Sequence, residues 1–221
     1  MTLPNQLTIL RILLSPVAVF LLLAQDPVAV RLGTAVFIIA SLTDWYDGHF
    51  ARKYGYVTDW GKFLDPLADK VLISSILLSF VLLNHLQAIW VMIIVIRDVI
   101  VTALRGYMMM NDKVIAANTF AKWKTFSQNI LVYLVLIYIN FSGPLTPDSP
   151  SLGFISYRFI DIFAQVVAYY TLLTGLFYLY DNRKPLIELF GLFYRWIIPF
   201  NLLPEMSKDS DEDQPKNSDG K

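Results

Sequence analysis

Residues 44–69 read DWYDGHFARKYGYVTDWGKFLDPLAD and interrupt a chain that is otherwise strongly apolar. Asp44 and Asp47 are three positions apart, and Asp65 and Asp69 are four apart. Residues at these spacings lie on one face of a helix, so each pair is expected to share a face. Carboxylates next to apolar segments are costly in a membrane and usually mark function, and four facing one another repel unless divalent cations lie between them. The stretch therefore indicates a metal-dependent site at a membrane surface.

The composition places the chain among membrane proteins. Of its 221 residues, 56% are hydrophobic and only 16% are charged, which is too apolar for an ordinary soluble domain. The formal net charge is zero, so no bulk charge favours nucleic acid as a partner. The sequence contains no cysteine, which removes thiolate ligands and leaves oxygen atoms as the expected metal ligands.

Six apolar segments are long enough to cross a bilayer, which takes roughly 20 residues in a helix. None shows the alternation typical of a membrane β-strand. The segments are residues 7–24, 31–51, 64–84, 88–109, 125–141 and 159–180. The sequence thus predicts an all-α, polytopic membrane protein with six transmembrane helices in one domain, residues 1–184. The first segment has no small-residue cleavage site and is expected to be retained as a span.

Basic residues gather in alternate connections of the predicted bundle. They lie between the second and third spans, between the fourth and fifth, and after the sixth, whereas residues 84–87 and 142–157 contain neither Lys nor Arg. The positive-inside rule then predicts that both termini and the aspartate stretch face the cytosol, in the cytoplasmic membrane. Residues 185–206 are aromatic and contain prolines, which predicts an interfacial helix, and residues 207–221 form a polar tail that is predicted to be disordered.

The residues around the aspartates suit phosphate chemistry. Carboxylate oxygens select Mg²⁺ or Mn²⁺, and two such ions could bridge phosphate oxygens. Gly48 and Gly61 leave room for a nucleotide to approach the backbone, Ala51 is small, and Arg52 can form a bidentate contact with phosphate. Asp69 is the candidate general base, because it lies one turn beyond Asp65 and could reach an attacking hydroxyl. Asp65 is also expected to cap its helix, with Pro66 at the first helical position.

The fixed positions of this stretch match the pattern D-x2-D-G-x2-A-R-x8-G-x3-D-x3-D throughout. The chain therefore resembles the CDP-alcohol phosphotransferases. The resemblance implies a six-helix membrane enzyme, commonly a homodimer, with a divalent-metal site and a CDP-linked lipid donor. It implies that Asp44, Asp47 and Asp65 bind metal and that Asp69 both binds metal and acts as base. It also implies a CDP pocket, formed by Asp44, Gly48, Ala51, Arg52, Gly61 and Asp65.

The acceptor is indicated by cations further along the chain. Arg97 and Arg105 are eight residues apart and so lie on nearly the same helix face, and Lys122 and Lys124 follow. Such a group suits an anionic acceptor whose phosphate binds apart from the metals. Segments 4–11, 64–70, 97–105 and 122–125 resemble bacterial family members that use glycerol 3-phosphate, although those usually carry Glu after the arginine where this chain has Asp98. The resemblance thus implies transfer of a phosphatidyl group from CDP-diacylglycerol to glycerol 3-phosphate, with release of CMP.

Several alternatives remain open from the sequence alone. The acceptor could be inositol phosphate, serine or phosphatidylglycerol, and the four aspartates could instead serve a divalent-cation transporter, although they lie at span ends rather than at the bilayer midplane. Arg97 could form a purely structural pair with Asp98. Arg105 and the two lysines could be cytosolic anchors. His85 is expected to be solvated in an outer loop.

Overall fold

The computed structural model describes the backbone of residues 3–54, 59–110, 119–183, 185–187 and 191, and the side chains of residues 6–43, 66–109, 123–183, 185–187 and 191. The chain divides by its contacts into two units, Met1–Asn182 and Arg183–Lys221. The described part of the first unit contains six long helices and no β-strand. They are α1 Leu3–Leu23, α2 Pro27–Tyr54, α3 Asp59–Leu82, α4 Ala88–Met110, α5 Thr119–Ser142 and α6 Tyr157–Asp181.

The all-helical prediction is thereby confirmed for the described residues. The six helices cover the six apolar segments that the sequence singles out, with ends that differ by up to six residues. The predicted interfacial segment, residues 185–206, is described only at 185–187 and 191, where the backbone is helical. The predicted tail, residues 207–221, lies outside the described residues. These two predictions therefore stay predictions.

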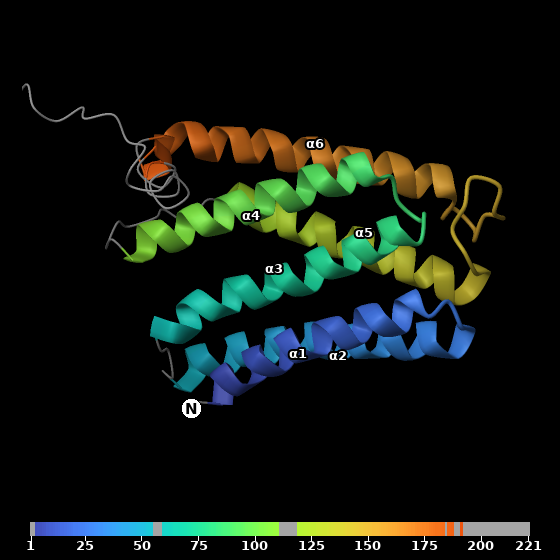
Figure 1. Ribbon diagram of the computed structural model, residues 1–221, viewed down its shortest axis with the longest axis horizontal. Helices are drawn as coiled ribbons and strands as arrows, with labels where there is room; N and C mark the ends of the chain where they lie inside the picture. Colours follow the sequence, from blue (N-terminus) through green and yellow to red (C-terminus); the bar gives the residue numbers. More distant parts are fainter. Residues whose placement is uncertain (1–2, 55–58, 111–118, 184, 188–190, 192–221) are drawn as a thin grey trace, which may run out of the picture. The chain divides into compact units, whose positions relative to one another are not determined.

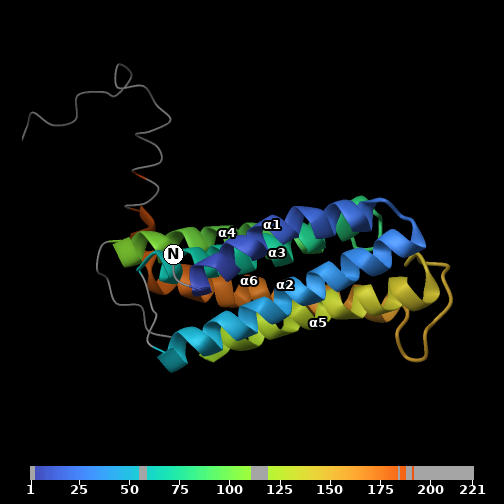
Figure 2. The ribbon, with the colours of Figure 1, turned by 90° about the horizontal axis from the view of Figure 1, so that it is seen from below.

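Consecutive helices run in opposite directions along the bundle (Figure 1 and Figure 2). One end of the unit, here called the aspartate end, is formed by the starts of α1, α3 and α5 and the ends of α2, α4 and α6. The opposite end contains the connections 24–26, 83–87 and 143–156. Helix α1 packs against α2 and α3, α6 packs against α4 and α5, and contacts of α3 with α4 and α5 join the two groups.

The turns at the opposite end show why the helices start and stop there. Asp26 accepts hydrogen bonds from the N–H groups of Val28 and Ala29, both at 3.0 Å, and Pro27 begins α2. This is the acidic N-cap followed by proline that favours a helix start. After α3, Asn84 takes a positive φ of 59°. The N–H groups of Asn84 and His85 donate to backbone carbonyls of the last helical turn, the pattern of a Schellman C-cap.

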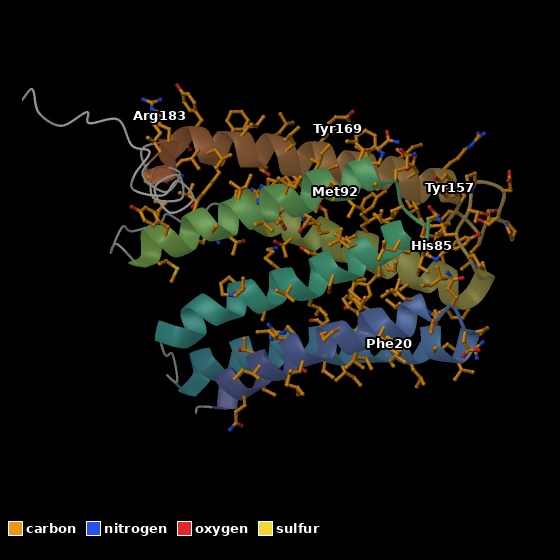
Figure 3. The ribbon with its side chains drawn as sticks, viewed as in Figure 1. Phe20, His85, Met92, Tyr157, Tyr169 and Arg183 are labelled. Atoms are coloured by element: carbon orange, nitrogen blue, oxygen red, sulfur yellow. The ribbon has the colours of Figure 1, made fainter. Side chains whose placement is uncertain are left out.

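His85 lies in this turn, and its environment corrects the expectation of a solvated side chain. Only 7% of the residue is exposed, and its Nδ1 lies 3.3 Å from the carbonyl oxygen of Leu145 (Figure 3). Burial lowers the pKa of His85, and the hydrogen bond to Leu145 opposes that effect. The expectation was wrong because the long connection 143–156 packs over this turn, which loop composition alone does not reveal.

A continuous apolar core fills the described bundle and includes Phe37, Phe80 and Tyr138, which are fully buried. Two partly buried hydrogen bonds link α2 to α5. Asn140 donates to Thr34 Oγ1 at 2.8 Å, and Tyr133 Oη donates to Ser41 Oγ at 3.1 Å. Hydrogen bonds between membrane helices contribute about 0.6 kcal/mol each on average. They therefore set the pairing of α2 with α5 more than they stabilise it.

The outer surface of the bundle is apolar. Large side chains point outward along the helices, for example Phe20, 74% exposed, and Phe177, 70% exposed. Among the described residues, three helices are long and apolar enough to cross a bilayer, through Gln6–Leu23, Trp123–Ser142 and Tyr157–Asp181. A soluble monomer would not present so much contiguous apolar surface. The chain is a membrane protein.

Candidate active site

The backbone of all four predicted aspartates is helical. Asp44 and Asp47 lie in α2, and Asp65 and Asp69 lie in α3. Their spacings therefore place each pair on one helix face, as the sequence predicts. The helix ends differ from expectation, because α2 continues to Tyr54 and α3 already begins at Asp59.

The expected N-cap role of Asp65 is consequently wrong, since Asp65 and Pro66 are both inside α3. Proline lacks an N–H group, so Pro66 removes one intrahelical hydrogen bond and disfavours the helix at this point. The helix nevertheless continues on both sides of it. The aspartate pairs thus sit within two helices rather than at their termini, and the connection between these helices is shorter than the interval between the predicted spans, 31–51 and 64–84.

The side chains of most predicted donor-site residues lie outside the described set. These are Asp44, Asp47, Gly48, Ala51, Arg52, Gly61 and Asp65, together with Lys122 of the predicted acceptor site. Asp69 is described; its side chain is 26% exposed, and its carboxylate lies 3.6 Å from the Nζ of Lys70. No group of three or more metal-ligating side chains occurs among the side chains that are described. A donor set made only of carboxylate oxygens is the kind that hard divalent cations prefer.

A second group of charged side chains surrounds Asp98 of α4, the helix that follows α3. Asp98 is only 3% exposed and contacts a cation or amide from each of three helices. Lys70 Nζ of α3 lies 3.3 Å from Oδ2, and Gln128 Nε2 of α5 donates to the same oxygen at 3.3 Å. Arg97 Nη1 donates to Oδ1 at 3.3 Å, and Lys124 Nζ of α5 also donates to Oδ1. We call Lys70, Arg97, Asp98, Lys124 and Gln128 the Asp98 cluster.

The Asp98 cluster carries more positive than negative charge. Three cations share one carboxylate, and Lys124 is nearly as buried as Asp98, with 3% of its side chain exposed. A charge held away from water without a full counter-charge is expensive, so such a surplus is stable mainly where an anion can bind. The Arg97–Asp98 contact that the sequence left open as a structural pair is present, but it is one of several contacts and leaves the surplus in place.

Lys70 links the Asp98 cluster to the aspartate pairs. Its Nζ lies 3.6 Å from an Asp69 oxygen and 3.3 Å from an Asp98 oxygen. The candidate base and the cationic cluster are therefore neighbours. A substrate that carries both a hydroxyl and a phosphate could place the first near Asp69 and the second near the cations.

The structure places Arg97 and Lys124 in one cluster, as the sequence predicts, while Arg105 lies two helical turns further along α4. The guanidinium carbon of Arg105 is 5.9 Å from the centre of the Tyr178 ring on α6. Sequence reasoning gave no site role to Lys70, and none to Asp98 beyond a structural pair with Arg97, and it missed Gln128 and α6. A usable signal existed for the first two, because Lys70 directly follows Asp69 and Asp98 is an acid in the middle of an apolar run.

Comparison with known proteins agrees with this architecture. The family model described as CDP-alcohol phosphatidyltransferase matches residues 1–177, and the chain belongs to this family. A Bacillus subtilis protein named CDP-diacylglycerol–glycerol-3-phosphate 3-phosphatidyltransferase is 37% identical over 196 residues, which cover 83% of this chain and 96% of the relative. A protein of the same name from Rickettsia typhi is 32% identical over 176 residues, covering 80% and 94%. Another from Haemophilus influenzae is 37% identical over 134 residues, covering 57% and 70%.

Proposed function

We propose that this protein transfers the phosphatidyl group of CDP-diacylglycerol to sn-glycerol 3-phosphate and releases CMP. In this reaction the acceptor hydroxyl oxygen forms a bond to the phosphorus that carries diacylglycerol. The bond between that phosphorus and the CMP oxygen breaks, and the hydroxyl proton passes to Asp69. The family and the names of its relatives support the reaction class.

The observation that carries the choice of acceptor is the charge surplus of the Asp98 cluster. A glycerol 3-phosphate phosphate group is close to dianionic at neutral pH, and three cations face the Asp98 carboxylate there, one of which, Lys70, also lies 3.6 Å from Asp69. Arg97 can bind the phosphate through a planar fork, and Lys124 acts as a point charge. Arg105 and Lys122 complete the proposed acceptor site. A neutral acceptor, or a zwitterion such as serine, would leave this surplus unmatched.

The donor side of the proposal uses the aspartate pairs. Asp44, Asp47, Asp65 and Asp69 are proposed to hold two divalent cations, Mg²⁺ or Mn²⁺, which when bound would neutralise the diphosphate charge. Asp69 is proposed to accept the proton of the attacking hydroxyl, and Lys70, whose Nζ lies 3.6 Å from its carboxylate, is proposed to orient it. The CDP moiety is proposed to bind along Gly48, Ala51, Arg52 and Gly61, together with Asp44 and Asp65.

The proposed setting is a cytoplasmic membrane crossed by all six helices, with both termini and the aspartate end in the cytosol. The antiparallel order of the helices and the apolar outer surface support this arrangement (Figure 2). Water-soluble glycerol 3-phosphate and the head group of CDP-diacylglycerol could then meet at one membrane face. A homodimer is proposed from the family resemblance.

The deciding experiment is an acceptor screen in detergent, with CMP release from CDP-diacylglycerol as the readout. Glycerol 3-phosphate is expected to support turnover, whereas serine, inositol phosphate and phosphatidylglycerol are not.

The variant Arg97→Gln is expected to raise the KM for glycerol 3-phosphate by about 10- to 100-fold, because a charge-assisted hydrogen bond to phosphate is lost. It is expected to leave the KM for CDP-diacylglycerol within about 2-fold. Turnover with another acceptor alone would overturn the substrate, and equal effects on both KM values would overturn the role of Arg97.

A further inference from the structure

Helix α6 approaches Arg97 at a glycine. A Cβ atom built on Gly175 would lie 2.6 Å from Cγ and 2.8 Å from Nε of Arg97, and 3.3 Å from its Cδ. Real Cβ atoms essentially never approach other heavy atoms below 3.0 Å. The middle of the Arg97 side chain therefore occupies space that exists only because residue 175 has no side chain.

Arg97 is held at its tip as well. Its Nη1 donates to Asp98 at 3.3 Å, so the side chain contacts both a carboxylate of its own helix and the bare backbone of α6. Only 11% of the side chain is exposed, which leaves it little room to take another rotamer. A methyl group at position 175 would have to displace the guanidinium rather than a loose end of the chain.

The same face of α6 contacts the second arginine. Tyr178 follows Gly175 by three positions and so lies on the same side of the helix. Arg105 lies over its ring at 5.9 Å, within the range of a cation–π interaction. The Tyr178 hydroxyl is buried and has no hydrogen-bond partner among the described residues.

We infer that α6 is a positioning surface for the acceptor site, in which Gly175 sets the place of Arg97 and Tyr178 sets that of Arg105. This inference rests on the proposed function, because it assumes that the two arginines bind the acceptor phosphate. Gly175 and Tyr178 are positioning residues that act through the arginines. They matter because bidentate recognition of phosphate depends on the orientation of the guanidinium plane.

The test compares Gly175→Ala with Gly33→Ala. Gly33 is a matched control because its added Cβ would also meet a neighbouring helix, at 3.1 Å from the Ala18 carbonyl oxygen and the Leu21 Cβ, in the contact between α1 and α2. In detergent, Gly175→Ala is expected to raise the KM for glycerol 3-phosphate by about 10- to 100-fold, since a misplacement of about 1 Å has effects of that order. The KM for CDP-diacylglycerol stays within about 2-fold, and Gly33→Ala changes neither value beyond that.

Tyr178 provides a second test should Gly175→Ala fail to fold. Tyr178→Leu removes the ring and is expected to raise the acceptor KM several-fold, and Tyr178→Phe, which keeps the ring, is expected to raise it less. An unchanged acceptor KM, or an equal rise in both KM values, would overturn the inference. If Arg97→Gln weakens acceptor use while the α6 variants do not, the inference fails and the proposed function stands. If the wild type makes no CMP with glycerol 3-phosphate, the proposed function itself fails.

Discussion

The Asp98 cluster and the opposite end of the helical bundle treat their polar groups in different ways. At the opposite end, His85 pairs with the Leu145 carbonyl, and Asp161 accepts hydrogen bonds from Gln87 at 3.2 Å and Gln165 at 2.9 Å. His85 and Asp161 thus both have neutral partners supplied by the fold. In the Asp98 cluster, three cations converge on one carboxylate that is 3% exposed.

This difference distinguishes polar groups whose partners are all supplied by the fold from charged groups whose charge only a ligand could balance. Neutral hydrogen bonds at a loop are satisfied once the chain is folded, so they call for no further partner. A buried cluster with excess charge is a cost to folding that an incoming anion offsets. The contrast supports a functional role for the Asp98 cluster, and it can be tested by changing carboxylates at or next to the cluster and at the opposite end.

The largest expected effect is on turnover, from Asp69→Asn. This change removes the proposed base and keeps the size of the side chain. We expect kcat to fall by about 10²- to 10⁴-fold, the usual contribution of a general base, while circular dichroism and the thermal midpoint in detergent stay close to wild type. Asp161→Asn at the opposite end is the matched control and is expected to keep wild-type turnover. Substantial activity in Asp69→Asn would remove the base role and leave the rest of the comparison intact.

The next effect is on stability, from Asp98→Ala. Removing one partner of a buried ion pair typically costs about 3–5 kcal/mol, because the remaining charges lose their counter-charge. Asp161→Ala removes a partly exposed carboxylate and should cost about 0.5 kcal/mol or less. Thermal unfolding in detergent should therefore show a much lower midpoint for Asp98→Ala than for Asp161→Ala.

Thermal unfolding of Asp98→Glu and Asp98→Asn shows whether the stability depends on the charge of residue 98 or on the length of its side chain. The glutamate variant keeps the charge on a longer arm and should recover part of the midpoint, whereas the asparagine variant should resemble Asp98→Ala. Glycerol 3-phosphate should raise the midpoint of the wild type, since a ligand that binds only the folded state stabilises it. Equal midpoints for Asp98→Ala and Asp161→Ala would mean that the cluster is no more strained than the opposite end.

Much of the fold could be predicted from the sequence because it depends on single helices. Long apolar runs set the existence of the helices, and spacings of three and four set which aspartates share a face. Helix ends were harder, since the Asp65–Pro66 pair has the chemistry of a helix start but α3 begins six residues earlier, at Asp59. A local signal for a helix start is overridden when the residues before it are also helical.

Contacts between helices were not predictable in the same way. The sequence placed Arg97 and Lys124 among the acceptor cations, but the meeting of Lys70, Asp98 and Gln128 depends on how α3, α4 and α5 are rotated against one another. The periodicity of apolar residues in one helix shows which face of that helix is buried, but not which residues of another helix that face contacts. Gly175 shows the limit most clearly, because a glycine in an apolar helix predicts close packing without saying that an arginine lies against it.

The smallest expected effect is a pH dependence of stability at the opposite end. His85 has an ordinary pKa near 6.5, and burial lowers it in the folded protein. The unfolded chain then binds a proton more readily, so His85 costs no stability above about pH 6.5 and destabilises the fold as the pH falls below that value. The loss amounts to about 1.4 kcal/mol for each unit between the two pKa values.

Thermal midpoints measured from pH 7.5 down to pH 5 should therefore fall more for the wild type than for His85→Gln. CMP release at pH 7.5 should be the same in both proteins, because this turn contributes nothing to the acceptor site. If His85→Gln keeps the wild-type pH dependence, the acid sensitivity belongs to other groups. The contrast between the opposite end and the Asp98 cluster would then be smaller than their geometry indicates.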